Sequence, residues 1–379
     1  TISKRSFLRK AGLVLAGSCV TFLSRSPRRR RASALGPQLA AAKEQVIGYR
    51  SLLLPVGTAR VPVSFWYPTA QSGGSAGSRQ RREETPYRHF ISVGKIVEVL
   101  QGSEVPRSVG WEYKLRSGED IAIRQNAPVA SASVAATTLQ ERRKAAGLGA
   151  QQCAVIFAHG YLGSRFDMLH LCELLASQGF VVAAPDFAEG LSGSVPADPE
   201  QVNRGKILSA TIRRLQKEFE AEQFGIVGHS AGGGTATMAT GGFSCGRVAV
   251  AGLAPGYQGP DPLLVVASAG DGVIPLSRVV QAVPKGAASF ERGEDVDVTE
   301  TAAALLMRQG RGEPLPCHIS FLSSEANNAM ISLLSPLLPV ARALEVPVLD
   351  FDKYLALQDA DSVAAEVLPV IERFFIHHA

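Results

Sequence analysis

Short apolar runs and amphipathic stretches alternate along the second half of the chain. Residues 153–158, 180–184 and 224–227 are almost continuously apolar, which is typical of strands buried on both faces. Between these runs, residues 165–178 and 203–222 place apolar side chains at helical spacing. The pattern therefore predicts three buried strands connected by two helices.

The same rhythm continues towards the C-terminus. Apolar runs predict further strands at residues 248–253, 263–267 and 319–322, and helical spacing predicts a last helix at residues 362–376. Strands that alternate with helices form a doubly wound, mostly parallel sheet, so the predicted fold class is α/β. In such sheets, ligands bind at the carboxyl ends of the strands.

The first half of the chain is less regular. Residues 45–69 predict two strands, and residues 87–117 contain a helical pattern. A polar, low-complexity stretch and an Ala- and Ser-rich stretch make residues 71–150 a loop-rich, cap-like insertion. We expect the insertion to belong to one domain that spans residues 48–376.

The N-terminal segment is basic and contains no acidic residue. Nine of the 39 Lys and Arg residues, and none of the 34 Asp and Glu residues, lie within the first 35 positions. Lys4-Arg5 precede a short apolar stretch, which resembles a twin-arginine export signal, and the composition also fits an organellar transit peptide. We expect a targeting segment at residues 1–34, cleaved near residue 34, and a linker at residues 35–47. We expect the protein to be exported or directed to an organelle, with a plastid or thylakoid favoured. The alternative is a basic tail that has no targeting function.

Composition limits the remaining functions. The formal charge of +5 comes from the N-terminal segment, so the rest of the chain is slightly acidic and no nucleic-acid partner is expected. The five cysteines lack metal-ligand spacing and are expected to be buried free thiols, and no metal is predicted. No Gly-rich nucleotide-binding motif opens a helix, so no cofactor is predicted.

Ser230 lies in the motif Gly228-His229-Ser230-Ala231-Gly232. The motif follows an apolar run and precedes a helix-compatible stretch, an arrangement that presents a serine on a sharp turn between strand and helix. Small residues two before and two after the serine allow strand and helix to approach closely. The sequence therefore predicts Ser230 as a catalytic nucleophile.

A second turn predicts an oxyanion hole. His159-Gly160-Tyr161 follow the apolar run at residues 153–158, where a glycine lets backbone amides turn inward. The second amide of such a site belongs to the residue after the nucleophile. The predicted donors are the backbone amides of Tyr161 and Ala231.

The acid and the base of a triad are expected after later strands. Asp271 follows the predicted strand at residues 263–267 and is the candidate acid. The segment after the predicted last strand contains Asn327 and Asn328 where a histidine is required, so Asn328 is assigned to that position. His318 would lie at the opposite end of that strand. The base is therefore expected to be either lost or supplied by a histidine that the sequence pattern does not reveal.

These segments resemble the serine α/β-hydrolases, specifically the branch with platelet-activating-factor acetylhydrolases, chlorophyllases and dienelactone-hydrolase-like proteins. The resemblance is carried by the segments Phe65-Trp66-Tyr67-Pro68, Phe157 to Arg165, Leu175 to Pro185 and Gly228 to Gly233. It implies hydrolysis of a lipid-like carboxylic ester, such as a 1-alkyl-2-acetylglycerophosphocholine, through an acyl-enzyme on Ser230. It also implies no metal and an apolar pocket, and it is compatible with peripheral contact with a membrane.

The chain departs from this branch at the acid and the base. Platelet-activating-factor acetylhydrolases place the acid after the strand that follows the nucleophile helix, whereas Leu253-Ala254-Pro255-Gly256 contains no carboxylate. An asparagine also cannot accept the serine proton. The alternatives to a lipid esterase are therefore a chlorophyllase-like esterase and a catalytically weak hydrolase fold that binds a lipid or pigment. The oligomeric state is not determined by the sequence.

Overall fold

The computed structural model of the chain describes most residues between Val46 and Ala379, which belong to one compact unit. The described residues are 46–69, 87–101, 105–117, 121–129, 141, 153–196, 198, 200–253, 257–309, 314–334 and 360–379. The predicted targeting segment, almost all of the linker, and the polar stretch at residues 71–85 lie outside these ranges.

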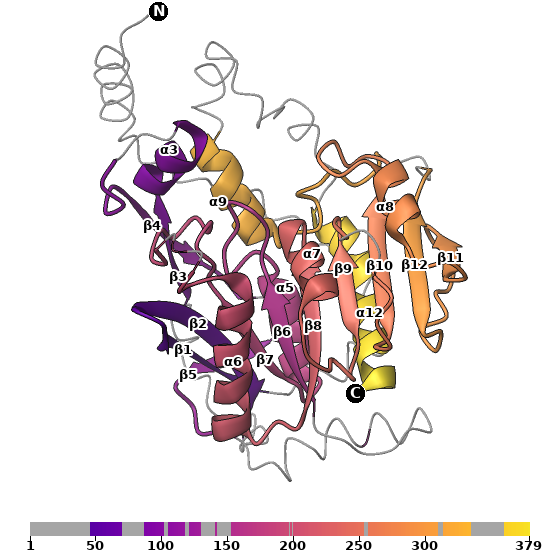
Figure 1. The fold of residues 1–379 in the computed structure, drawn as a ribbon, viewed down its shortest axis with the longest axis horizontal. Helices are drawn as coiled ribbons and strands as arrows, with labels where there is room; N and C mark the ends of the chain where they lie inside the picture. The colour runs from indigo at the N-terminus through magenta and orange to yellow at the C-terminus, as the bar shows by residue number, and fades with distance from the viewer. Residues whose placement is uncertain are drawn as a thin grey trace, which may run out of the picture. The chain divides into compact units, whose positions relative to one another are not determined.

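A large, mostly parallel sheet forms the centre of the described structure (Figure 1), which confirms the predicted fold class. Its ten strands run in the order β11-β12-β10-β9-β8-β6-β7-β2-β1-β5. Strands β6 to β12 pair in parallel, whereas β2 pairs antiparallel with both β7 and β1. The strands are β1 (Val46–Val56), β2 (Ala59–Pro68), β5 (Ala122–Gln125), β6 (Cys153–Ala158), β7 (Val181–Pro185), β8 (Gln223–His229), β9 (Arg247–Val250), β10 (Leu263–Ser268), β11 (Ala288–Glu291) and β12 (Ala302–Met307).

Helices cover both faces of this sheet. Helices α6 (Arg204–Phe219) and α7 (Ala231–Met238) pack on one face, and α5 (Leu169–Ser177) and α12 (Ala360–His378) pack on the other (Figure 1). The short helix α8 (Leu276–Ala282) follows β10 and contacts it. This is the doubly wound arrangement that alternating strands and helices require.

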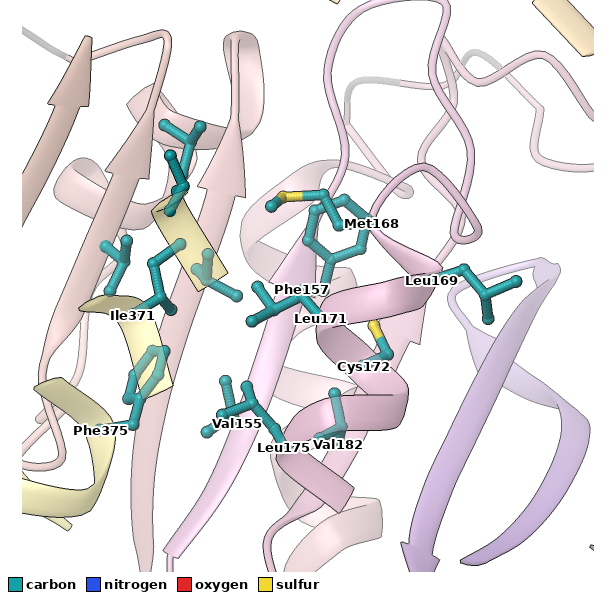
Figure 2. Close-up of a cluster of buried hydrophobic side chains, with 14 of the residues drawn as sticks. Val155, Phe157, Met168, Leu169, Leu171, Cys172, Leu175, Val182, Ile371 and Phe375 are labelled. Atoms are coloured by element: carbon teal, nitrogen blue, oxygen red, sulfur yellow. The ribbon is translucent and has the colours of Figure 1, made fainter. Parts of the chain in front are cut away.

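Strand β6 shows why the central strands are apolar along their whole length. All six of its residues are buried, because successive side chains point to opposite faces and both faces are covered by helices. Val155 and Phe157 pack with α5 and α12, in the core shown in Figure 2, whereas Ile156 packs on the side of α6.

Three strands and one helix in the C-terminal part differ from the prediction. The segment at residues 317–322 is not a strand but a turn, closed by the Ser320 amide, which donates to the Cys317 carbonyl over 3.1 Å. The last strand of the sheet to occur in the chain is instead β12, and helix α9 (Ser324–Leu334) follows the turn. Strand β11 was likewise not predicted.

The insertion contributes a separate two-stranded sheet. Strands β3 (Tyr87–Ser92) and β4 (Gly110–Leu115) pair antiparallel, and α3 (Val93–Gln101) connects them. The amide of Ser92 donates to the carbonyl of Leu191, and Arg107 donates to the carbonyl of Val195, so this unit is tied to the loop after β7. Helix α9 contacts β4. Among the described helices, none combines the length and apolarity needed to cross a bilayer.

A disulfide joins two of the cysteines that were expected to be free. Cys153 begins β6, and Cys245 lies just before β9; their Cα atoms are 6.5 Å apart. Strand β8 lies between these two strands in the sheet. The bond therefore links β6 to the start of β9 across β8 at the amino ends of these strands, while Cys172 and Cys317 are buried free thiols.

Candidate active site

Ser230 occupies a tight turn between β8 and α7. Its φ of +57° and ψ of −120° are unusual for a residue with a side chain, and they are the values expected where a strand turns abruptly into a helix. The amide of Ser230 donates to the Val250 carbonyl of β9 over 2.9 Å, which fixes the turn against the neighbouring strand. The serine is thus presented at the carboxyl edge of the sheet.

Glycines on both sides of Ser230 are required by close backbone approach. A Cβ atom added at Gly228 would lie 1.9 Å from the Gly232 carbonyl oxygen, and one at Gly232 would lie 1.8 Å from the Ala158 carbonyl oxygen. Real Cβ atoms never approach so closely, so larger residues would push strand and helix apart. The predicted reason for these small residues is therefore confirmed.

His318 is the histidine that pairs with the candidate acid. Its Nδ1 lies 2.8 Å from Oδ2 of Asp271, and both side chains are almost completely buried. The other carboxylate oxygen of Asp271 accepts hydrogen bonds from the amides of Val273 and Ile274, each at 2.8 Å. Because an ionised carboxylate only accepts, the proton of neutral His318 must lie on Nδ1, which leaves Nε2 with a free lone pair.

This geometry corrects the assignment of Asn328 to the base position. Asn327 and Asn328 lie in the first turns of α9, where Asn328 is exposed to solvent and Asn327 is buried. The sequence prediction is wrong at this point because the apolar run at residues 319–322 forms a turn rather than the last strand. Once Ala302–Met307 is recognised as that strand, His318 lies on the loop that follows it, as a triad base should.

The other two buried histidines at this edge are occupied by structural hydrogen bonds. His159 places Nδ1 2.7 Å from the Gly160 carbonyl and accepts from the Phe187 amide at Nε2 over 2.9 Å. Burial, followed by the nearby Arg204 guanidinium, lowers the pKa of His159 to about 4. His229 places Nε2 2.8 Å from the carbonyl of His318. His159 therefore uses both ring nitrogens for backbone contacts, and His229 uses Nε2 in the same way.

The two predicted oxyanion donors lie on either side of Ser230. A Cβ atom added at Gly160 would be 3.0 Å from Cβ of Ser230, so the turn that contains Tyr161 adjoins the serine. Ala231 is the first residue of α7, where a helix leaves the amide without a partner. Within the described residues, neither amide donates to a protein acceptor. Both are thus available to a ligand oxygen.

Charged side chains brace the walls of this site. The Arg204 guanidinium donates through one nitrogen to the His159 carbonyl at 3.0 Å and to Oγ1 of Thr235 at 2.9 Å, and it pairs with Glu189. It therefore connects the turn after β6 to helix α7, which contribute one oxyanion amide each. No cluster of three or more potential metal ligands occurs in the part of the chain that the structure describes.

Asp186, the residue directly after β7, forms a buried ion pair with Arg165. One carboxylate oxygen lies 2.5 Å from Arg165 and 2.9 Å from Oγ of Ser192. Burial is the largest single influence and raises the pKa of Asp186, but Arg165, the histidines His159 and His89 and the Ser192 hydrogen bond together hold the pKa below its ordinary value. This carboxylate is committed to Arg165 and does not pair with a histidine in the way that Asp271 does.

The fold and the site define a class of α/β protein. It has a serine on a strand-to-helix turn after β8, and an Asp–His pair on the loops after β10 and β12. Residues 155–372 match the model of a family described as the alpha/beta hydrolase family, so the chain belongs to the alpha/beta hydrolase family. No curated protein matches the chain.

The solved structures that match the chain are distant from it in sequence. A ferulic acid esterase from Streptomyces cinnamoneus is 15% identical, with a TM-score of 0.44 and coverage of 93% of this chain and 92% of that one. A putative dienelactone hydrolase from Klebsiella pneumoniae is 12% identical, with a TM-score of 0.34 and coverage of 76% and 97%. At such identities and scores, these similarities do not identify a substrate.

Proposed function

We propose that the protein is a serine carboxylic-ester hydrolase in which Ser230 is the nucleophile, His318 the base and Asp271 the acid. The observation that carries this proposal is the 2.8 Å hydrogen bond between His318 and Asp271 on the loops that follow β12 and β10. It orients the imidazole of His318. The backbone carbonyl of the same residue is bound by His229, the residue next to Ser230. Ser, Asp and His also occur in the chain order of this fold.

The proposed reaction has two half-reactions. Nε2 of His318 takes the proton from Oγ of Ser230 as the serine attacks the ester carbonyl, and the amides of Tyr161 and Ala231 stabilise the resulting oxyanion. The imidazolium, stabilised by Asp271, returns the proton to the leaving alcohol, and an acyl-serine remains. Water then attacks this acyl-enzyme with the same base, and the carboxylic acid and free serine are released.

The reading as a catalytically weak binding protein rested on an asparagine at the base position. Because His318 rather than Asn328 contacts Asp271, that argument no longer holds. We retain the enzyme and do not propose the binder.

For the substrate, we propose an ester with an apolar, lipid-like portion. Tyr161 and Val273 follow the candidate oxyanion glycine and the candidate acid, and their side chains are 53% and 41% exposed. Exposed apolar side chains at the edge of a site favour apolar ligands. A phospholipid with a short acyl chain and a chlorophyll-type ester are the two substrate types to be compared.

The test is steady-state hydrolysis of p-nitrophenyl esters with acyl chains from two to twelve carbons. Wild-type protein is expected to turn over the series, whereas Ser230→Ala is expected to lose turnover while its thermal unfolding stays within a few degrees. A 1-alkyl-2-acetylglycerophosphocholine and chlorophyll are then compared as competing substrates. Equal turnover by Ser230→Ala would contradict the nucleophile, and a preference for small polar esters would contradict the substrate class.

A further inference from the structure

His229 makes a contact that the proposed reaction does not itself require. It is the residue before Ser230, and its side chain points from the end of β8 towards the loop that carries His318. Its Nε2 lies 2.8 Å from the His318 carbonyl oxygen, and the two imidazole rings have their centroids 4.8 Å apart. The nucleophile turn thus contacts both the backbone and the ring of the candidate base.

We infer that His229 is a positioning residue, which sets the place of the His318 imidazole relative to Ser230 through this hydrogen bond and ring contact. The inference rests on the proposed function. It adds a link that the triad lacks: Asp271 orients His318 from one side, while His229 fixes its backbone from the nucleophile side. The position of the base relative to the nucleophile then depends on a side chain next to the nucleophile itself.

The protonation state of His229 suits this role. Burial, with the neighbouring His318 as the second cause, lowers the pKa of His229 to about 3, so the ring is neutral at working pH. A carbonyl oxygen only accepts, so the single proton of the neutral ring must lie on Nε2. His229 therefore donates to His318 without adding a charge that would oppose formation of an imidazolium on His318 during turnover.

The loop of His318 needs such an anchor because it is irregular. Residues 314–323 contain no helix or strand, and the Cys317–Ser320 turn lies within them. The Ser323 amide donates to the Asp167 carbonyl over 2.7 Å, which fixes the end of this segment. At His318 itself, the backbone carbonyl is held by His229, and the ring is held by Asp271.

The test compares two substitutions at His229. His229→Phe keeps a ring against His318 but removes the donor, and His229→Gln places an amide donor at a similar reach. We expect His229→Phe to lower kcat for p-nitrophenyl acetate by about 10- to 100-fold, since small misplacement of a catalytic group costs rates of this size. KM is expected to change by less than about threefold. We expect His229→Gln to recover most of kcat.

The matched control is His378→Phe. His378 also donates from Nε2 to a backbone carbonyl, that of Val298 at 2.9 Å, and its ring lies 4.7 Å from that of Phe374. It belongs to α12, and the same change there removes the same kind of bond outside the candidate site. We expect kcat of His378→Phe to stay within about twofold of wild type, even where its unfolding temperature falls as much as that of His229→Phe.

The rate of phosphonylation of Ser230 by a fluorophosphonate is measured for every variant. If wild type and His229→Phe react at the same rate, the role of His229 is contradicted but the proposed function is not. An equal loss of reaction rate in His229→Phe and His229→Gln has the same meaning. A wild type that does not react contradicts the proposed function and, with it, this role. If His229→Phe does not fold, the test rests on His229→Gln. A His229→Gln variant that is phosphonylated much more slowly than wild type would contradict the role of His229, whereas a near-normal rate would support it.

Discussion

At the scale of single residues, the site depends on which nitrogen of which histidine is free. Asp271 accepts three hydrogen bonds, two from backbone amides and one from His318, and so remains an acceptor fixed in place. His159 and His229 have comparable burial, but both ring nitrogens of His159 and Nε2 of His229 contact backbone groups. Only His318, of these three histidines, pairs with a carboxylate and keeps Nε2 for proton transfer.

His318→Asn is expected to lower kcat for p-nitrophenyl esters by about a thousandfold or more, because loss of a triad base removes proton transfer and leaves the oxyanion hole. The matched variant is Asn328→His, which places a histidine at the position suggested by the sequence. Because Asn328 is exposed on α9, this change is expected to leave kcat within about twofold. A variant Asn328→His with raised activity, or an active His318→Asn, would reverse the assignment.

At the scale of elements, the turn after β6 is held by one buried carboxyl group. Oδ1 of Asp167 accepts hydrogen bonds from the amide and the hydroxyl of Ser164, at 3.0 and 2.9 Å. The backbone carbonyl of Asp167 accepts a hydrogen bond from the amide of Ser323. Asp167 thereby joins the oxyanion turn to the end of the loop that carries His318. Burial raises the pKa of Asp167 from 3.8 to about 7.

This shift predicts a pH-dependent stability. Between pH 4 and 7, the folded protein holds the proton of Asp167 while the unfolded chain has released it, so this group's contribution to stability falls as pH rises through that window. Asp167→Asn keeps the Oδ1 acceptor and removes the charge. At pH 8, it is expected to gain on the order of 1–4 kcal/mol relative to wild type, with little gain at pH 4.

Urea unfolding at pH 4 and pH 8 measures this difference. The control is Asp295→Asn, because that carboxyl group is 89% exposed and its ion pair with Arg373 lies at the surface. An Asp167→Asn variant whose gain does not grow with pH would show that Asp167 is ionised in the folded protein at neutral pH.

The sequence predicted the elements around Ser230 well but failed at the base. Continuous apolar runs such as residues 153–158 are read reliably, because a strand covered on both faces tolerates few polar residues. Ala302–Met307 is also continuously apolar, but alanine, leucine and methionine favour helices, and the strand was missed. Ile319 to Leu322 then resembled a strand, which placed His318 at the wrong end of it.

At the scale of the whole molecule, the Cys153–Cys245 disulfide closes a chain segment of 92 residues that includes Ser230. Sequence spacing could not have revealed it, because the two cysteines meet only when β6 and β9 take their places on either side of β8. Such bonds persist in oxidising compartments. We therefore retain export or an organelle as a proposal, with the basic leader at residues 1–34 as its second support.

Loss of the disulfide is expected to destabilise the protein without changing the chemistry. The double variant Cys153→Ser/Cys245→Ser should lose about 2–5 kcal/mol of unfolding free energy, because a long closed loop restricts the unfolded chain. Reduction of wild-type protein should have the same effect on its urea midpoint. Two free thiols at these positions in unreduced native protein, or an unchanged midpoint, would show that the bond does not form.

The location is tested by N-terminal sequencing of the protein from its native source after fractionation. The account expects a mature N-terminus near residue 35 and recovery outside the cytosol. An intact basic segment on a cytosolic protein would contradict the proposed export and would leave the disulfide without its expected compartment.

The most direct test of the account is the site and rate of reaction with a fluorophosphonate, followed by mass spectrometry of the digested protein. The account predicts a single stoichiometric adduct on Ser230 in wild type, slowed by about a thousandfold or more in His318→Asn and absent in Ser230→Ala. An unlabelled wild type, or equal labelling of wild type and His318→Asn, would contradict the claim that His318 activates Ser230.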